Sequence, residues 1–161
     1  EGACLMTDTT VEVKILGENH DSKLNFTLAA LAHDCMEAIG APRFTEEEKA
    51  YARQVAQAVG LPGVEGELDE SILPVDGTIK KDNGSSDVAD VSQIVPVVNI
   101  NTACYGRKTP NHSWAVTVQA DKPAAHRGML FAAKTLALMG TRLATEPTLL
   151  AAVRAEFEQA E

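Results

Sequence analysis

One of the four histidines in the chain, His112, follows a proline-bearing turn in the stretch RKTPNHSW, residues 107–114. A neutral imidazole offers a lone pair and titrates near physiological pH, so His112 is a candidate metal ligand or general base. A loop histidine that hydrogen-bonds a nearby carbonyl fits the same spacing. A single histidine does not make a zinc site, which takes three or four protein ligands, and the sequence contains no HxxxH, HExxH or CxxC pattern.

Two further places carry polar groups that could act on a substrate. In GSSDVADVS, residues 84–92, Ser85, Ser86 and Asp87 can cap a short helical turn, and backbone amides at such a turn can also receive an anion. His126 lies in the first turn of an alanine-rich segment, where the helix dipole favours a neutral ring. A packed or capping histidine is the alternative interpretation for His126.

Composition narrows the class of protein. The chain has 161 residues, enough for one domain with a core, and a formal charge of -9 that argues against nucleic-acid binding. No apolar run is long enough to cross a bilayer. The cysteines Cys4, Cys35 and Cys104 suit a reducing compartment better than a disulfide framework, which predicts a cytoplasmic protein.

Periodicity predicts three strands and four helices that would position these groups. Alternation of β-branched and polar residues predicts a half-buried strand at 9–16, a second strand at 94–100 and a third at 113–119. Helices are predicted from Asn25 to Gly40, from Thr45 to Gly60, from Pro123 to Gly140 and after Thr145. The connection at 61–84 is predicted to be irregular. Helices that flank a small set of strands predict a layered α/β architecture.

Three stretches carry a resemblance to a known family: GSSDVADVS (84–92), TACYGRKTPNHSW (102–114) and HRGMLFAAKTLA (126–137). In order and spacing they are similar to the C-terminal part of the dinuclear-metal amidohydrolases and aminoacylase-type metallopeptidases, in the p-aminobenzoyl-glutamate hydrolase subgroup. The N-terminal stretch ACLMTDTTVEVKIL resembles the end of that family's inserted lid or dimerisation domain. The resemblance covers almost the whole chain.

The resemblance implies a role for each candidate residue. His112 matches the family's final metal ligand, and Ser86, Asp87 and Asp90 match a loop near the site, which implies substrate binding. His126 matches a His-Lys-Gly-Met motif, in which Arg127 replaces the usual lysine, and it too would bind substrate. No catalytic residue is assigned within this chain. Lys108 stands where the family commonly has glycine, and Asn111 replaces the glycine before the ligand.

The family also implies a fold, a domain division, cofactors and partners. Residues 1–16 would end the lid or dimerisation domain, and 17–161 would supply the C-terminal portion of a three-layer αβα, phosphorylase/hydrolase-like catalytic domain. The complete protein would bind two divalent ions, Zn²⁺ or Mn²⁺, and hydrolyse the amide of an N-acyl or N-aroyl amino acid. Its partners would be the missing N-terminal half of the catalytic domain and a further subunit, through the lid domain. The alternative is a non-catalytic binding or assembly module that keeps the fold without metal.

Overall fold

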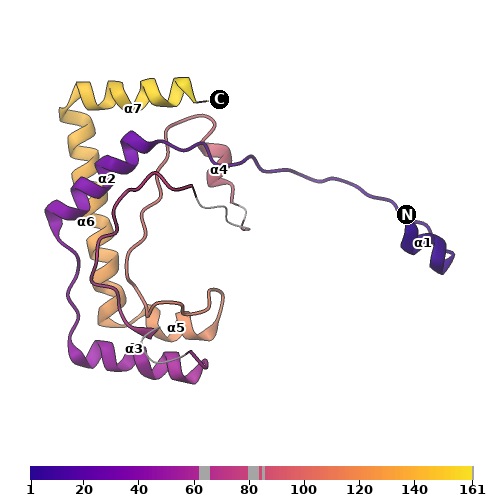
Figure 1. Cartoon of the computed structure of the whole chain (residues 1–161), viewed down its shortest axis with the longest axis horizontal. Helices are drawn as coiled ribbons and strands as arrows, with labels where there is room; N and C mark the ends of the chain where they lie inside the picture. The colour runs from indigo at the N-terminus through magenta and orange to yellow at the C-terminus, as the bar shows by residue number, and fades with distance from the viewer. Residues whose placement is uncertain (62–65, 80–83, 85, 161) are drawn as a thin grey trace.

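The structure is a computed structural model that describes residues 1–61, 66–79, 84 and 86–160. Seven helices lie in these ranges, joined by extended or irregular segments (Figure 1). None of these helices is long and apolar enough to cross a membrane. The helices are α1 (Gly2–Thr7), α2 (Phe26–Ile39), α3 (Glu46–Ala58), α4 (Val88–Val91), α5 (Trp114–Ala120), α6 (Pro123–Thr145) and α7 (Pro147–Gln159).

Helix α2 begins at a fully occupied cap. The Asn25 side chain accepts a hydrogen bond from the backbone N–H of Leu28 at 2.8 Å, which is the N-cap geometry expected from the sequence. The two oxygens of Glu156, from α7, accept the N–H groups of Phe26 and Thr27 at 2.7 and 2.8 Å. The first three amides of α2 therefore have acceptors, and the cap ties α2 to the C-terminal helix.

Helix α3 begins at the predicted capping box. Thr45 accepts the N–H of Glu48 at 3.2 Å, and the Glu48 carboxylate accepts the N–H of Thr45 at 2.6 Å. Gly40 and Gly60, which were expected to stop the two helices, have φ of +80° and +76°. Glycine adopts this left-handed backbone at no steric cost, so both stops are explained.

The core is a layer of helices. Helix α6 packs against α2, α5 and α7, and α2 also contacts α7. One apolar cluster joins α2, α6 and α7, and its buried members are Leu28, Leu31, Ala32, Cys35, Met139 and Val153. A smaller cluster joins α3 to the start of α6 through Phe44, Ala52, Leu68 and Ala124. In Figure 1 the core helices α2, α6 and α7 stand together, while α1 lies apart at the end of a long N-terminal arm.

The predicted three-layer αβα fold is wrong, because no strand forms among the described residues. Residues 9–16 and 96–100 are not helical. No strand pairs with either segment in the described part of the chain. A β-strand needs a lateral partner for its backbone groups, and alternation in the sequence does not supply one. The arm at 9–16 is exposed throughout, with Val13 at 81% and Leu16 at 87% exposure.

The third predicted strand, 113–119, is helix α5. Seven residues are too few to separate a period of two from a helical period, and Ala115 and Gln119, four apart, are the buried positions. Residues 67–79 are irregular, as predicted, while 62–65, 80–83 and Ser85 lie outside the described residues.

Helix α6 extends past Gly140, where the sequence predicted its end, to Thr145. The large apolar side chains Met129, Leu130 and Leu136, which helical spacing predicts to share a buried face, are 62%, 54% and 54% exposed. The face that is buried instead consists of Ala124, Ala125, Gly128, Phe131, Thr135 and Met139. Ala124, Ala125 and Gly128 on this face are small, and at Gly128 neighbouring backbone approaches α6 closely.

Candidate functional site

His112 lies on a loop that the chain builds from its own side chains. The Tyr105 hydroxyl donates to the Asn111 side-chain oxygen at 3.2 Å, and the Ser113 hydroxyl donates to the Pro110 carbonyl at 2.5 Å. The buried Thr109 hydroxyl donates to the Gly106 carbonyl at 2.6 Å. These bonds close the loop at 105–113 around His112, whose own side chain is exposed.

A buried glutamine on α5 fixes the base of this loop. The Gln119 side-chain oxygen accepts the N–H of Gly106 at 3.0 Å, and its amide nitrogen donates to the Ala115 carbonyl at 2.8 Å and to the Thr109 hydroxyl at 3.4 Å. Gln119 is 3% exposed, so each of these bonds replaces a bond to water that burial has removed. This role could not be read from the sequence, because a lone glutamine in a predicted strand has no distinctive spacing.

The backbone of the loop is left-handed at two residues. Lys108 and His112 both have φ of +56°. This conformation costs an L-residue roughly 1 kcal/mol, and only glycine adopts it freely. Lys108, at which the resemblance implies a glycine, therefore adopts a backbone conformation that favours glycine. Asn111, which replaces the other glycine that the resemblance implies, is not among the residues with positive φ, and its side-chain oxygen accepts the Tyr105 hydroxyl.

Helix α6 holds the segment that leads into the loop. A Cβ added at Gly128 would lie 2.4 Å from the Ala103 carbonyl oxygen and 2.7 Å from the Cys104 sulfur. Only glycine permits this approach of α6 to residues 103 and 104. The glycine of the HRGM motif thus connects two of the three stretches that carried the family resemblance.

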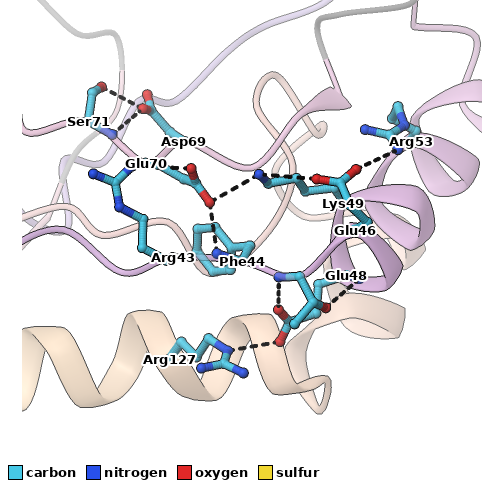
Figure 2. A network of polar contacts seen from close by, with 11 residues as sticks. Arg43, Phe44, Glu46, Glu48, Lys49, Arg53, Asp69, Glu70, Ser71 and Arg127 are labelled. Atoms are coloured by element: carbon cyan, nitrogen blue, oxygen red, sulfur yellow. Dashed lines mark hydrogen bonds and ion pairs between the residues drawn. The ribbon is translucent and has the colours of Figure 1, made fainter.

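The arginine of the same motif is bound to α3. Arg127 donates through Nε to the Glu48 carboxylate at 2.9 Å, and the Glu48 side chain is only 9% exposed (Figure 2). Burial raises the pKa of Glu48, but the hydrogen bonds from Thr45 and Arg127 outweigh it, so the net pKa is lowered. His126, the predicted substrate-binding residue beside Arg127, is exposed in the first turns of α6.

Figure 2 also shows how the connection before the 84–92 stretch is anchored. The Glu70 carboxylate accepts the N–H of Phe44 at 2.8 Å and pairs with Lys49 at 3.2 Å and Arg43 at 3.3 Å. The Phe44 N–H, followed by the charges of Lys49 and Arg43, holds the pKa of Glu70 below its ordinary value. The residues at 69–71 are therefore fixed to the start of α3.

The polar stretch at 84–92 contains the short helix α4, and its residue Asp90 binds His20 in the segment before α2. Ser86 accepts the N–H of Val88 at 3.2 Å, while Asp87 makes no side-chain cap. Asp90 accepts both the backbone N–H of His20 at 3.0 Å and the His20 ring at 2.8 Å. The hydrogen bond from the His20 backbone N–H is the largest cause that lowers the pKa of Asp90, and the bond to the His20 ring lowers it further. His20 has the sequence context of a surface residue, and its pairing with Asp90 leaves no pattern in the sequence.

The candidate residues of the three stretches are not joined to one another by polar contacts among the described residues. No hydrogen bond or ion pair joins His112 or His126 to the residues at 86–90, in the part of the chain that the structure describes. The same ranges contain no group of three histidine, cysteine or carboxylate side chains that could hold a metal ion. The described residues thus offer His112 as one imidazole donor and do not complete a metal site by themselves.

Among curated proteins, the chain is similar to p-aminobenzoyl-glutamate hydrolase of Escherichia coli (strain K12), in the subunit designated B, with 30% identity over 182 residues. The alignment covers 99% of this chain and 38% of that protein, so the chain spans well under half the length of its curated relative. The predicted resemblance is therefore confirmed. No protein-family model matches the chain. No solved structure matches it either.

Proposed function

We propose that these residues form part of a hydrolase that cleaves the amide bond of an N-acyl or N-aroyl amino acid, of the p-aminobenzoyl-glutamate type. The similarity to the E. coli p-aminobenzoyl-glutamate hydrolase over nearly the whole chain is the observation that carries the proposal. The activity would belong to a polypeptide that includes further residues, because the described ranges contain no group of side chains that could hold a metal ion.

In this proposal His112 is a metal ligand. Its loop is closed by side chains of the same chain, so the imidazole needs little further ordering when it binds an ion. The remaining ligands of two divalent ions, Zn²⁺ or Mn²⁺, would come from outside these residues. Such an ion lowers the pKa of a bound water and polarises an amide carbonyl.

The residues that the family resemblance implies for substrate binding are Ser86, Asp87, Asp90 and His126. All four belong to stretches that carried the family resemblance, and Ser86, Asp87 and His126 are exposed. Asp90 is the exception, because its carboxylate is already engaged by His20 at 2.8 Å. Its role is therefore to orient the 84–92 stretch rather than to contact the substrate.

The proposal also assigns domains and partners. Residues 1–16 would end a lid or dimerisation domain, and 17–161 would be the C-terminal portion of the catalytic domain. The exposed arm at 9–16 supports this division, because it does not pack against the helical layer. A further subunit would associate through the lid domain. We also propose a cytoplasmic location, which the three free cysteines support.

The test uses a hybrid protein, in which these 161 residues replace the matched segment of the E. coli hydrolase. Metal content is measured by elemental mass spectrometry, and hydrolysis of p-aminobenzoyl-glutamate is measured by release of p-aminobenzoate. His112→Ala should remove one bound ion and lower turnover by more than roughly 100-fold. His33→Ala is the matched control, since His33 lies on α2 outside the proposed site.

Unchanged metal content and unchanged turnover in His112→Ala would refute the role of His112. A hybrid that folds but binds no metal and hydrolyses nothing would instead favour the non-catalytic binding or assembly module. In that case His112→Ala should change the stability of the hybrid by no more than about 0.5 kcal/mol, as is usual for an exposed residue.

A further inference from the structure

The loop at 105–113 holds a backbone conformation that its residue types do not favour. His112 and Lys108 both have φ of +56°, where the Cβ of an L-residue crowds the following carbonyl oxygen. The His112 side chain is exposed, so packing of the imidazole does not hold its backbone in place. Because a strained backbone persists only where the surrounding structure over-determines it, other groups must fix this loop.

The hydrogen bonds of the Gln119 side chain reach the beginning of the loop, its middle and the helix that follows it. The side-chain oxygen accepts the N–H of Gly106 at 3.0 Å. The side-chain nitrogen donates to the Thr109 hydroxyl at 3.4 Å and to the carbonyl of Ala115, in the first turn of α5, at 2.8 Å. A side-chain amide has one acceptor oxygen and two N–H donors, so each polar group of Gln119 is used to join these points.

The Thr109 hydroxyl continues this chain of hydrogen bonds. It accepts the bond from Gln119 and donates to the Gly106 carbonyl at 2.6 Å. Gln119 and Thr109 are 3% and 7% exposed, so a bond lost between them would leave a buried polar group without a partner. The two side chains together hold the backbone on both sides of His112.

Helix α5, which carries Gln119, is itself anchored to longer helices. The Tyr51 hydroxyl of α3 donates to the Val118 carbonyl of α5 at 2.9 Å. Helix α5 also packs against α3 and α6, and its residue Ala115 is completely buried. The bonds of Gln119 therefore fix the loop relative to a rigid part of the fold, which is the support that a binding side chain needs.

We propose that Gln119 is a positioning residue for His112. Its bonds hold the loop in the left-handed conformation, so that the His112 imidazole has its orientation set before it binds an ion. A ligand that is ordered in advance loses less conformational entropy on binding. The proposal rests on the proposed function, since it takes His112 to be a metal ligand. Gln119 itself contacts neither metal nor substrate in this role.

The test uses the hybrid protein and two readouts other than turnover. Zn²⁺ affinity is measured by competition with a chelator, and the coordination geometry is followed by the visible absorption of the Co²⁺-loaded protein. Gln119→Leu should change the Co²⁺ spectrum and raise the dissociation constant of the ion that His112→Ala removes by roughly 10–100-fold. Thr109→Val should raise the same constant by about threefold or more, while Thr109→Ser keeps the hydroxyl and should match the parent hybrid.

Asn25→Leu is the matched control, because Asn25 is a second buried side-chain amide with the same kinds of partners. Asn25 is 4% exposed, its oxygen accepts the N–H of Leu28 at 2.8 Å, and its nitrogen donates to the Val153 carbonyl at 2.9 Å. These bonds join α2 to α7 and do not reach the loop. Asn25→Leu should lower the urea midpoint of the hybrid, as Gln119→Leu does, and leave the Zn²⁺ dissociation constant within about twofold of the parent.

Unchanged Zn²⁺ affinity and an unchanged Co²⁺ spectrum in Gln119→Leu, with loss of the ion in His112→Ala, would overturn the positioning role and leave the proposed function standing. Equal losses of Zn²⁺ affinity in Gln119→Leu and Asn25→Leu would also overturn it, because the effect would be one of stability. If Gln119→Leu does not fold, full affinity in Thr109→Val overturns the proposal. Unchanged metal binding in His112→Ala refutes the proposed function, and this proposal with it.

Discussion

Replacing Gly128 with alanine should destabilise the chain, although alanine is the better helix former. The added Cβ would lie 2.4 Å from the Ala103 carbonyl oxygen and 2.9 Å from its carbonyl carbon, and both atoms are backbone. Relief requires α6 or the segment at 103–104 to move by most of an ångström. Overpacking of this kind costs about 1–3 kcal/mol, and the helix propensity of alanine returns about 1 kcal/mol. We expect a net loss of up to about 2 kcal/mol.

The same substitution at Gly140 is the matched control. Gly140 lies in the same helix, and a Cβ built there meets no atom within 4 Å. Alanine should therefore stabilise the chain by about 0.5–1 kcal/mol through helix propensity alone. If alanine lowers the stability at Gly128 and raises it at Gly140, the loss at Gly128 comes from the close approach of α6 to Ala103. The general effect of removing a glycine from the helix would give a gain at both positions.

The assay is urea unfolding of both variants and the parent chain, followed by circular dichroism at about 222 nm and about pH 7. The slope with urea should be equal in all three proteins, so that the midpoints report stability. A Gly128→Ala midpoint at or above that of the parent chain would show that α6 does not approach Ala103 as closely as the structure has it. A urea midpoint for Gly140→Ala below that of the parent chain would refute the use of helix propensity as the reference for the effect at Gly128.

Three further predictions concern the loop and the caps. Lys108→Gly should raise the stability of the chain by about 0.5–1 kcal/mol in urea unfolding, because φ there is +56°, and no gain would argue against the left-handed turn. Gln119→Leu should cost about 1–3 kcal/mol and speed amide exchange at Gly106, which loses its acceptor; unchanged exchange would contradict the contact. Burial raises the pKa of Glu156, but the hydrogen bonds from Thr27 and Phe26 lower it on balance, so its contribution is present above about pH 4.5 and is lost as pH falls through the lower folded pKa. Glu156→Gln should therefore cost about 1 kcal/mol at about pH 7 and less near pH 3, and an equal cost at both would refute the assignment.

The helix starts were predictable because they depend on residues three or four apart. Asn25 caps α2 and Thr45 forms its box with Glu48, as the sequence indicated. The capping of α2 by Glu156 was not predictable, since 130 residues separate that carboxylate from Phe26. Local hydrogen bonds leave a pattern in the sequence, whereas contacts between distant elements leave one only when the fold is already known.

The strands failed for a related reason. The pattern of β-branched residues at 94–100 predicted a strand, but residues 94 and 95 lie in the turn after α4, and only the alternation of packed Val98 and Ile100 with exposed Asn99 agrees with the pattern. Whether such a chain becomes a strand depends on a neighbour, and none of the described residues provides one. At 113–119 the alternation was misleading, because these seven residues also fit a helix. In that helix Ala115 and Gln119, four residues apart, are buried on the same side.

The sequence indicated the loop that carries the candidate metal ligand His112, but it did not indicate which other side chains surround that loop. The turn chemistry of RKTPNHSW indicated a tight loop, and the loop at 105–113 is closed by contacts among its own residues together with the side chain of Gln119. A loop that forms from nearby residues can present His112 in a chain whose described residues supply no complete ligand set. Its metal affinity is then governed by groups elsewhere, so the His112→Ala effect on metal content should appear in the hybrid protein and be absent from the isolated chain.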